Sequence, residues 1–214
     1  MMRPAVLAVV LTLGSAPMSP GLASGEPFLD VYGGLTQTQS ARVTAQSCIA
    51  LVLCVAESGT ARTIDFEHSM TFGARRGYWL KDLPWVGVAV DLSFFTAEQS
   101  DVRFVVVPLS ALLMLRLSFL PTEDLPGGHL QPYLGFGPSV YYEHASVDFR
   151  PEMTKKTTWD RIDITLDARV GLAWQFNRRL ALFGEYRFMP PRNDGTKNET
   201  LKTHHFLRGV SVRF

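Results

Sequence analysis

The sequence lacks the features that mark several large classes of protein. Residues 26–214 contain no run of about 18 apolar residues, so no segment is expected to cross a bilayer as a helix. The formal net charge is only +1, which argues against a large basic surface for nucleic acid. An apolar content of 46% is too high for a chain that is disordered over most of its length.

The first part of the chain has the three-part layout of a secretory signal peptide. Residues 1–4 are short and basic, residues 5–14 are apolar without a charge, and residues 15–25 are small and rich in proline. The apolar run has about ten residues, which is too short to span a bilayer as a helix. We therefore predict a signal peptide at 1–24 and a single mature domain at 25–214.

Cysteine is scarce, because Cys48 and Cys54 are the only two in the chain. In an exported protein such a pair is expected to form a disulfide. The metal-binding alternative would need further thiol or imidazole ligands nearby, and none lies between the two cysteines. The sequence thus predicts a Cys48–Cys54 disulfide at the tip of a loop, and neither a metal nor a cofactor.

The most regular feature that is present is an alternation of apolar and polar residues with period two. In residues 162–176 every even position is apolar, while the odd positions carry Asp163, Thr165, Asp167, Arg169 and Gln175 among small residues. Period two is typical of a β-strand with one apolar face, because a helix would scatter the charges around its circumference. Comparable segments lie at 28–35, 70–80, 86–95, 102–117, 130–143, 180–188 and 203–214.

Eight such strands predict an all-β fold, either a soluble sandwich or a membrane barrel. Most are long enough for the roughly 9–11 residues that a tilted membrane strand needs. The connections 81–84 and 177–179 are short, whereas 36–62, 149–161 and 191–202 are long, which is the alternation of periplasmic turns and surface loops. Aromatic residues at both strand ends fit two interfacial girdles. We predict an eight-stranded antiparallel up-and-down transmembrane β-barrel.

The chain resembles the small eight-stranded outer-membrane barrels of the outer-membrane-protein-A-like, opacity and adhesin type. The resemblance rests on VYGG at 31–34, VAVDLSF at 88–94, PYLGFGP at 132–138 and GEYRF at 184–188. The last segment resembles the family's assembly signal, carried here by Gly209, Val212 and Phe214. The resemblance implies a monomer in the outer membrane, contacting its lipid and lipopolysaccharide and the outer-membrane assembly machinery, without nucleic acid.

An eight-stranded barrel is only wide enough for its own side chains to fill. Strand parity places five acids and five arginines on the inward face: Asp30, Asp91, Glu143, Asp167 and Glu185 against Arg75, Arg116, Arg169, Arg187 and Arg213. Buried charges have to be paired, and arginine's planar fork suits several carboxylates. We interpret this set as an ion-pair network that plugs the barrel, with a gated pore or proton path as the alternative.

The predicted function is a non-enzymatic outer-membrane barrel whose surface loops serve envelope integrity, adhesion or contact with an unidentified partner. The alternatives are a lipid-A-modifying enzyme and a small solute pore. An enzyme would need a serine and a histidine beside an acid. His144, Ser146 and Asp148 face outward by parity without a sign that they converge, and the other histidines of the rim (His68, His204, His205) are expected to be solvated.

Overall fold

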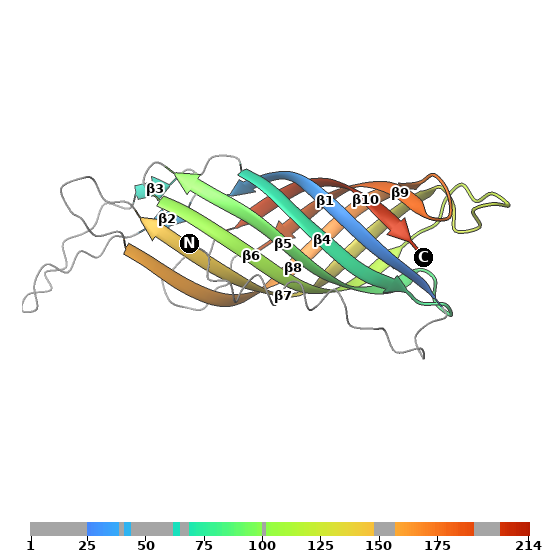
Figure 1. Cartoon of the computed structure of the whole chain (residues 1–214), viewed down its shortest axis with the longest axis horizontal. Helices are drawn as coiled ribbons and strands as arrows, with labels where there is room; N and C mark the ends of the chain where they lie inside the picture. The colour runs from blue at the N-terminus through green and yellow to red at the C-terminus, as the bar shows by residue number, and fades with distance from the viewer. Residues whose placement is uncertain are drawn as a thin grey trace, which may run out of the picture.

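The barrel is closed by hydrogen bonds between its first and last long strands (Figure 1). The computed structural model describes residues 25–38, 41–43, 62–64, 69–99, 102–147, 157–190 and 202–214. Its strands in barrel order are β1 (Glu26–Thr38), β10 (Thr203–Arg213), β9 (Leu180–Met189), β8 (Thr157–Gln175), β7 (Leu130–Val147), β6 (Val102–Arg116), β5 (Val86–Gln99) and β4 (Ser69–Trp79). Each strand pairs antiparallel with its neighbours, which confirms the predicted up-and-down barrel.

Two short strands, β2 (Ala41–Val43) and β3 (Arg62–Ile64), form a separate antiparallel pair outside the barrel. They belong to the long connection between β1 and β4. Within the described residues, no helix has the length and apolarity to cross a membrane.

The two faces of each strand differ as the alternation predicts. Along β1, Val31 and Leu35 are more than half exposed on the outer wall, whereas Asp30 and Tyr32 are almost fully buried. The same separation continues around the barrel, with outward apolar side chains that include Phe72, Val88, Leu134, Ile164, Leu166, Val170, Leu182 and Phe206. The structure therefore has an apolar outer wall around a polar interior.

Prolines interrupt the hydrogen-bonded pairing of two strand pairs without adding a residue. Pro108 lies where the β5–β6 register lapses between Leu92↔Leu109 and Phe95↔Val106, and the register resumes unchanged. Pro138 lies at the corresponding lapse between β6 and β7. Because proline has no N–H to donate, it interrupts the ladder, and the constant register shows that neither site is a bulge.

Short connections define one end of the barrel as the periplasmic end, following the usual pattern of such barrels. There β4 and β5 are joined by 80–85, and β8 and β9 by 176–179. The longer segment 117–129 is ordered: Phe119 bridges Leu130, and Leu125 is buried. The opposite end is called the surface end below.

Aromatic side chains ring both ends of the outer wall, with one correction. Trp85, Trp174 and Phe176 are exposed at the periplasmic end, and Phe94 and Phe206 are exposed towards the surface end. Trp79, which its place at a strand end would assign to the periplasmic girdle, instead points inward. Its ring stacks on Phe28 with centroids 5.6 Å apart, and its side chain is 5% exposed, because it occupies an inward position of β4.

Candidate functional site: the charged barrel interior

Arg169 is the centre of the ion-pair network in the middle of the barrel. Its Nη2 lies 2.7 Å from Asp91 Oδ1 and 2.8 Å from Asp167 Oδ2, and its Nη1 lies 3.2 Å from Glu185 Oε1. The side chains of all four residues are fully buried. A guanidinium can serve three carboxylates in this way because its five N–H groups form a planar fork.

Arg75 and Arg187 extend the network on either side of Arg169. Arg75 contacts Asp30 Oδ2 at 2.7 Å and Glu185 Oε2 at 2.6 Å, while Arg187 contacts Asp167 Oδ2 at 2.7 Å. Neutral groups complete the coordination: hydroxyls donate to the carboxylates from Tyr32, Ser110 and Tyr133.

A second cluster fills the periplasmic end of the barrel. Glu26 accepts from Arg116 Nη2 at 2.6 Å and from Arg213 Nη1 at 2.9 Å. Arg213 also donates to Gln131 and Gln175, each at 2.7 Å. The Arg116 guanidinium lies 4.3 Å from the centre of the Trp79 ring, a cation–π contact.

Nine of the ten predicted interior charges lie in these two clusters, and Glu143 does not. Glu143 is half-buried near the surface end, and its charged neighbours among the described residues are Arg161 and Asp163, outside the two clusters. The fifth acid that pairs with the arginines is instead Glu26, the first residue of β1, which lies two residues before the predicted strand. The inward parity of Asp30 and Tyr32 would have indicated Glu26 if the strand had been extended across Pro27.

With this exchange the charge of the two clusters is neutral, while Glu143 and the Arg161–Asp163 ion pair lie outside them. Five arginines (Arg75, Arg116, Arg169, Arg187 and Arg213) face five acids (Glu26, Asp30, Asp91, Asp167 and Glu185). Because each ion is held by a partner of opposite sign, no ion in the set is left to bear the desolvation cost alone. The seven ions around Arg169 block the middle of the barrel, since all of them are only 0–5% exposed.

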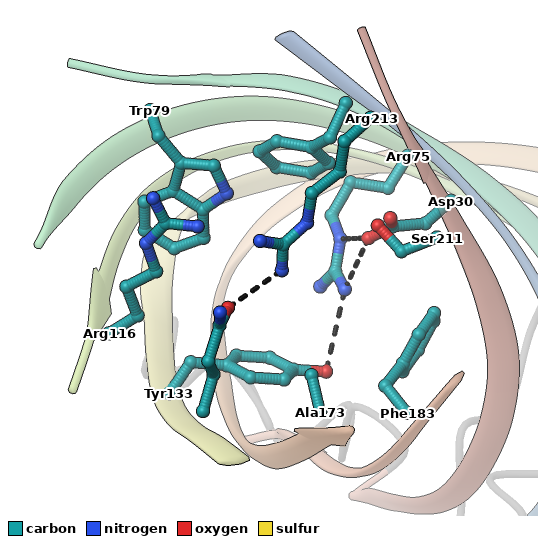
Figure 2. Close-up of a pocket in the computed structure, with 11 residues that line it drawn as sticks. Asp30, Arg75, Trp79, Arg116, Tyr133, Ala173, Phe183, Ser211 and Arg213 are labelled. Carbon is teal, nitrogen blue, oxygen red and sulfur yellow. Dashed lines mark hydrogen bonds and ion pairs between the residues drawn. The ribbon is translucent and has the colours of Figure 1, made fainter. Parts of the chain in front are cut away.

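A cavity of about 20 Å³ separates the two clusters (Figure 2). Figure 2 shows Arg75, Arg116 and Arg213 extending towards it, with Tyr133 and Phe183 on the far side. Such a volume holds about one water molecule. Asp30, Arg116 and Arg213 line it, and among the described residues Asp30 Oδ1, Arg116 Nη1 and Arg213 Nε have no hydrogen-bond partner. The space is therefore polar and too small for a ligand.

His205 is buried inside the barrel, contrary to the expectation of a solvated rim histidine. Its Nδ1 lies 2.8 Å from Thr36 Oγ1 and 3.0 Å from Thr71 Oγ1, and its Nε2 lies 3.0 Å from Thr203 Oγ1. The Phe95 ring meets its edge at 4.9 Å between centroids. Parity accounts for the difference, because His205 shares the inward face of β10 with Thr203 and Leu207.

His144 does face outward, as predicted, and it contacts an acid that the sequence did not suggest. Its Nδ1 lies 2.6 Å from Asp160 Oδ1 on β8, and the Tyr142 hydroxyl donates to the same oxygen at 2.7 Å. The side chain of Ser146 and the whole of Asp148 lie outside the described residues. Among the described residues, no serine or cysteine side chain is hydrogen-bonded to His144.

The last strand shows the faces expected from its sequence. Val210 and Phe214 face outward, while Ser211 and Arg213 are buried. A Cβ on Gly209 would meet the side chains of Tyr32 and Phe183 at 2.7 Å, so close packing inside the barrel already requires glycine here. A role of Gly209, Val212 and Phe214 in assembly stays a prediction, as does the disulfide, because Cys48 and Cys54 lie outside the described residues.

Comparison with known proteins identifies the fold. No family model and no curated protein matches the chain. Neisserial surface protein A superposes with a TM-score of 0.57 at 16% identity, over 89% of this chain and 99% of its own. Ail of Yersinia pestis, solved with the heparin analogue sucrose octasulfate, gives a TM-score of 0.50 at 16% identity, over the same shares of the two chains.

These likenesses agree with the physical argument from the strands. A closed barrel satisfies all its backbone hydrogen bonds internally, and an apolar outer wall suits it to lipid rather than water. The sequence prediction of a transmembrane barrel is confirmed. The chain has the fold of the small eight-stranded outer-membrane β-barrels.

Proposed function

We propose that this chain is a non-enzymatic outer-membrane barrel that acts through its outer wall and surface loops and not through a pore. The observation that carries the proposal is the fully buried network around Arg169, whose side chains fill the middle of the barrel. A conducting pathway would need a continuous wet lumen, as in barrels with many more strands. Residues 1–24 are, in this proposal, the segment removed on export.

The test of a closed interior is conductance in planar bilayers. The wild-type protein should give no steady single-channel current, because the ion pairs would have to break for a solute to pass. The triple variant Asp91→Ala, Asp167→Ala, Arg169→Ala removes the plug while keeping the charge within one unit, and it should conduct. Steady wild-type current would contradict the proposal and favour the small solute pore.

An enzymatic role finds less support. The His144–Asp160 pair resembles the base and orienting acid of a hydrolytic site, but such a site also needs a nucleophile beside the histidine. Mass spectrometry of lipid A from cells with and without the chain tests this directly. We expect identical lipid A in the two strains, and a loss or gain of an acyl chain would overturn the non-enzymatic proposal.

The charges of the surface loops favour one version of this function, which is contact with anionic polymers at the cell surface. Residues 149–161 carry Arg150, Lys155, Lys156 and Arg161 against Glu152 and Asp160. Sucrose octasulfate, the heparin analogue with which Ail was solved, carries negatively charged sulfate groups, as a sulfated polymer at the cell surface would. Exposed charges act over about 10 Å at physiological salt, so binding should weaken as salt is raised.

Heparin binding to cells that express the chain provides the measurement. The double variant Lys155→Ser, Lys156→Ser should reduce binding, whereas Lys81→Ser, in the turn at the periplasmic end, should leave it unchanged. Equal binding by all three proteins would exclude these loop cations as the contact.

A further inference from the structure

Arg208 is an unusual residue on the outer wall, because it is a cation at the sixth of the eleven positions of β10. It faces outward and is exposed. Its neighbours in register are Gly33 on β1 and Gly184 on β9, so no side chain flanks it on either adjacent strand. A charge that faces lipid destabilises a barrel according to its depth, which calls for a compensating group near Arg208.

The strand side chains that the structure describes offer no compensating group from a second copy of the chain. Among the strand side chains that the structure describes, the only outward acid is Asp160, and its carboxylate already accepts from Tyr142 and contacts His144. In a symmetric dimer through this face, Arg208 would approach the other Arg208. Charge complementarity therefore points to an anion of the membrane itself.

A shallow apolar hollow lies directly beside Arg208. Gly184 forms its floor, because a Cβ there would meet nothing within 4 Å. Val170 and Leu172 of β8 line one side, and Tyr186 and Phe206 line the side towards the surface end. A hollow with apolar walls in the lipid-facing wall suits a hydrocarbon chain.

Towards the surface end, a second cation, Lys202, immediately precedes β10, and a polar aromatic cluster lies beside it. Lys202 Nζ lies 5.6 Å from the centre of the Phe188 ring. Between the cations, His204 Nδ1 lies 2.6 Å from the Tyr186 hydroxyl, and the Tyr186 and Phe206 rings are 5.4 Å apart. Aromatic rings of this kind mark the level of the lipid headgroups, and the long side chain of Arg208 can extend towards that level.

We propose that this wall binds the lipid A part of lipopolysaccharide, a phosphorylated and acylated glycolipid of the outer leaflet. Lys202 and Arg208 hold its phosphates, and one acyl chain lies in the hollow at Gly184. The proposal deepens the proposed function by naming a lipid partner of the outer wall. It can fail independently, because the conductance test probes only the interior.

The first test is titration of the purified barrel with bisphosphorylated lipid A, followed by native mass spectrometry. The wild-type protein should retain one lipid A, and Arg208→Gln should weaken its binding about tenfold, the effect of losing one charged hydrogen bond. Lys202→Gln should also weaken binding. Arg76→Gln is the matched control, because Arg76 is an outward arginine of β4 near the periplasmic end and should have no effect.

Two further arms separate phosphate from acyl recognition. Dephosphorylated lipid A should bind the wild type and Arg208→Gln equally weakly. Gly184→Leu fills the hollow while both cations remain, and it should also reduce lipid A binding. Heat-modifiable gel mobility shows that each variant is folded, and Lys202→Gln supplies a second variant outside the middle of the strand.

Unchanged lipid A affinity of both Arg208→Gln and Lys202→Gln would overturn the proposal. So would a wild-type dimer in lipid-A-free vesicles that Arg208→Gln abolishes, because the occupant of this wall would then be a second copy. An equal loss of affinity in Arg76→Gln would show general charge attraction and would overturn the assigned site.

Discussion

The interior and the outer wall of this barrel treat the same residue type in opposite ways. Inside, Arg75, Arg169 and Arg187 are fully buried, and each lies against at least one carboxylate of the chain. Outside, Arg208 is flanked by glycines and by no acid that the structure describes. In the interior the protein itself supplies the counter-charges of its arginines, whereas Arg208 on the outer wall depends on the membrane for a counter-charge.

Breaking the interior balance should have the largest effect. Arg169→Met keeps the approximate volume but leaves Asp91, Asp167 and Glu185 with fewer cations than carboxylates. Removing one partner of a buried ion pair costs about 3–5 kcal/mol of stability. Denaturant unfolding in lipid vesicles should show this loss as a lower midpoint with an unchanged slope.

Glu143→Gln is the matched control for that experiment. Glu143 also faces the barrel interior, but it lies outside the network, so the unfolding midpoint should change little. A loss as large as that of Arg169→Met would mean that the network extends to the surface end.

Placing a new charge on the outer wall should have the next largest effect. Val170→Arg adds a cation to a lipid-facing position and should destabilise the barrel by about 2–4 kcal/mol if the site is near the bilayer midplane. Thr165→Arg is the comparison, since Thr165 lines the interior near Glu143 at the surface end. It should be tolerated far better, and equal tolerance of the two would contradict the assignment of faces.

His205→Leu probes the part of the interior that is held by hydrogen bonds between neutral side chains and not by ion pairs. The change leaves the hydroxyls of Thr36, Thr71 and Thr203 without the imidazole between them, at a cost of about 1–3 kcal/mol. The unfolding midpoint provides the measurement. An unchanged midpoint would show that the three hydroxyls satisfy one another without the histidine.

The smallest expected effect is a gain in the stability of the barrel. In vesicles of neutral phospholipid without lipopolysaccharide, Arg208→Gln removes a lipid-facing charge just inside the aromatic belt and should stabilise the barrel by about 1 kcal/mol. The gain should disappear when lipid A is added. A destabilised variant in neutral lipid would indicate that Arg208 has a protein partner.

Period two predicts the eight barrel strands and most of their faces, because every residue of a strand points to one side or the other, but it does not predict the short pair β2 and β3. Errors arose where a strand boundary or a rim had to be judged. Glu26 lies outside the predicted strand because β1 begins before the predicted boundary, and Trp79 and His205 follow the inward parity of their strands although such side chains at a strand end usually face outward. At these positions the alternation was a better guide than the usual preference of the side chain.

The pairing of the interior charges was not predictable from the sequence. Arg75 of β4 meets Glu185 of β9, and Arg169 of β8 meets Asp91 of β5, although β4 is not adjacent to β9 and β8 is not adjacent to β5. Which inward residues meet across the lumen depends on the tilt and stagger of all eight strands. Local patterns carry no information about that stagger, so the sequence could give the charges but not their partners.

Glu26 has a consequence for how the barrel folds. It lies on the first strand and contacts Arg213 on the last and Arg116 on β6, so it receives its partners only when the cylinder closes. An open sheet in the membrane would expose these ions to hydrocarbon, which makes partly formed barrels unfavourable. Closure and charge neutralisation are therefore a single cooperative step, and unfolding should pass directly from the complete barrel to the open chain.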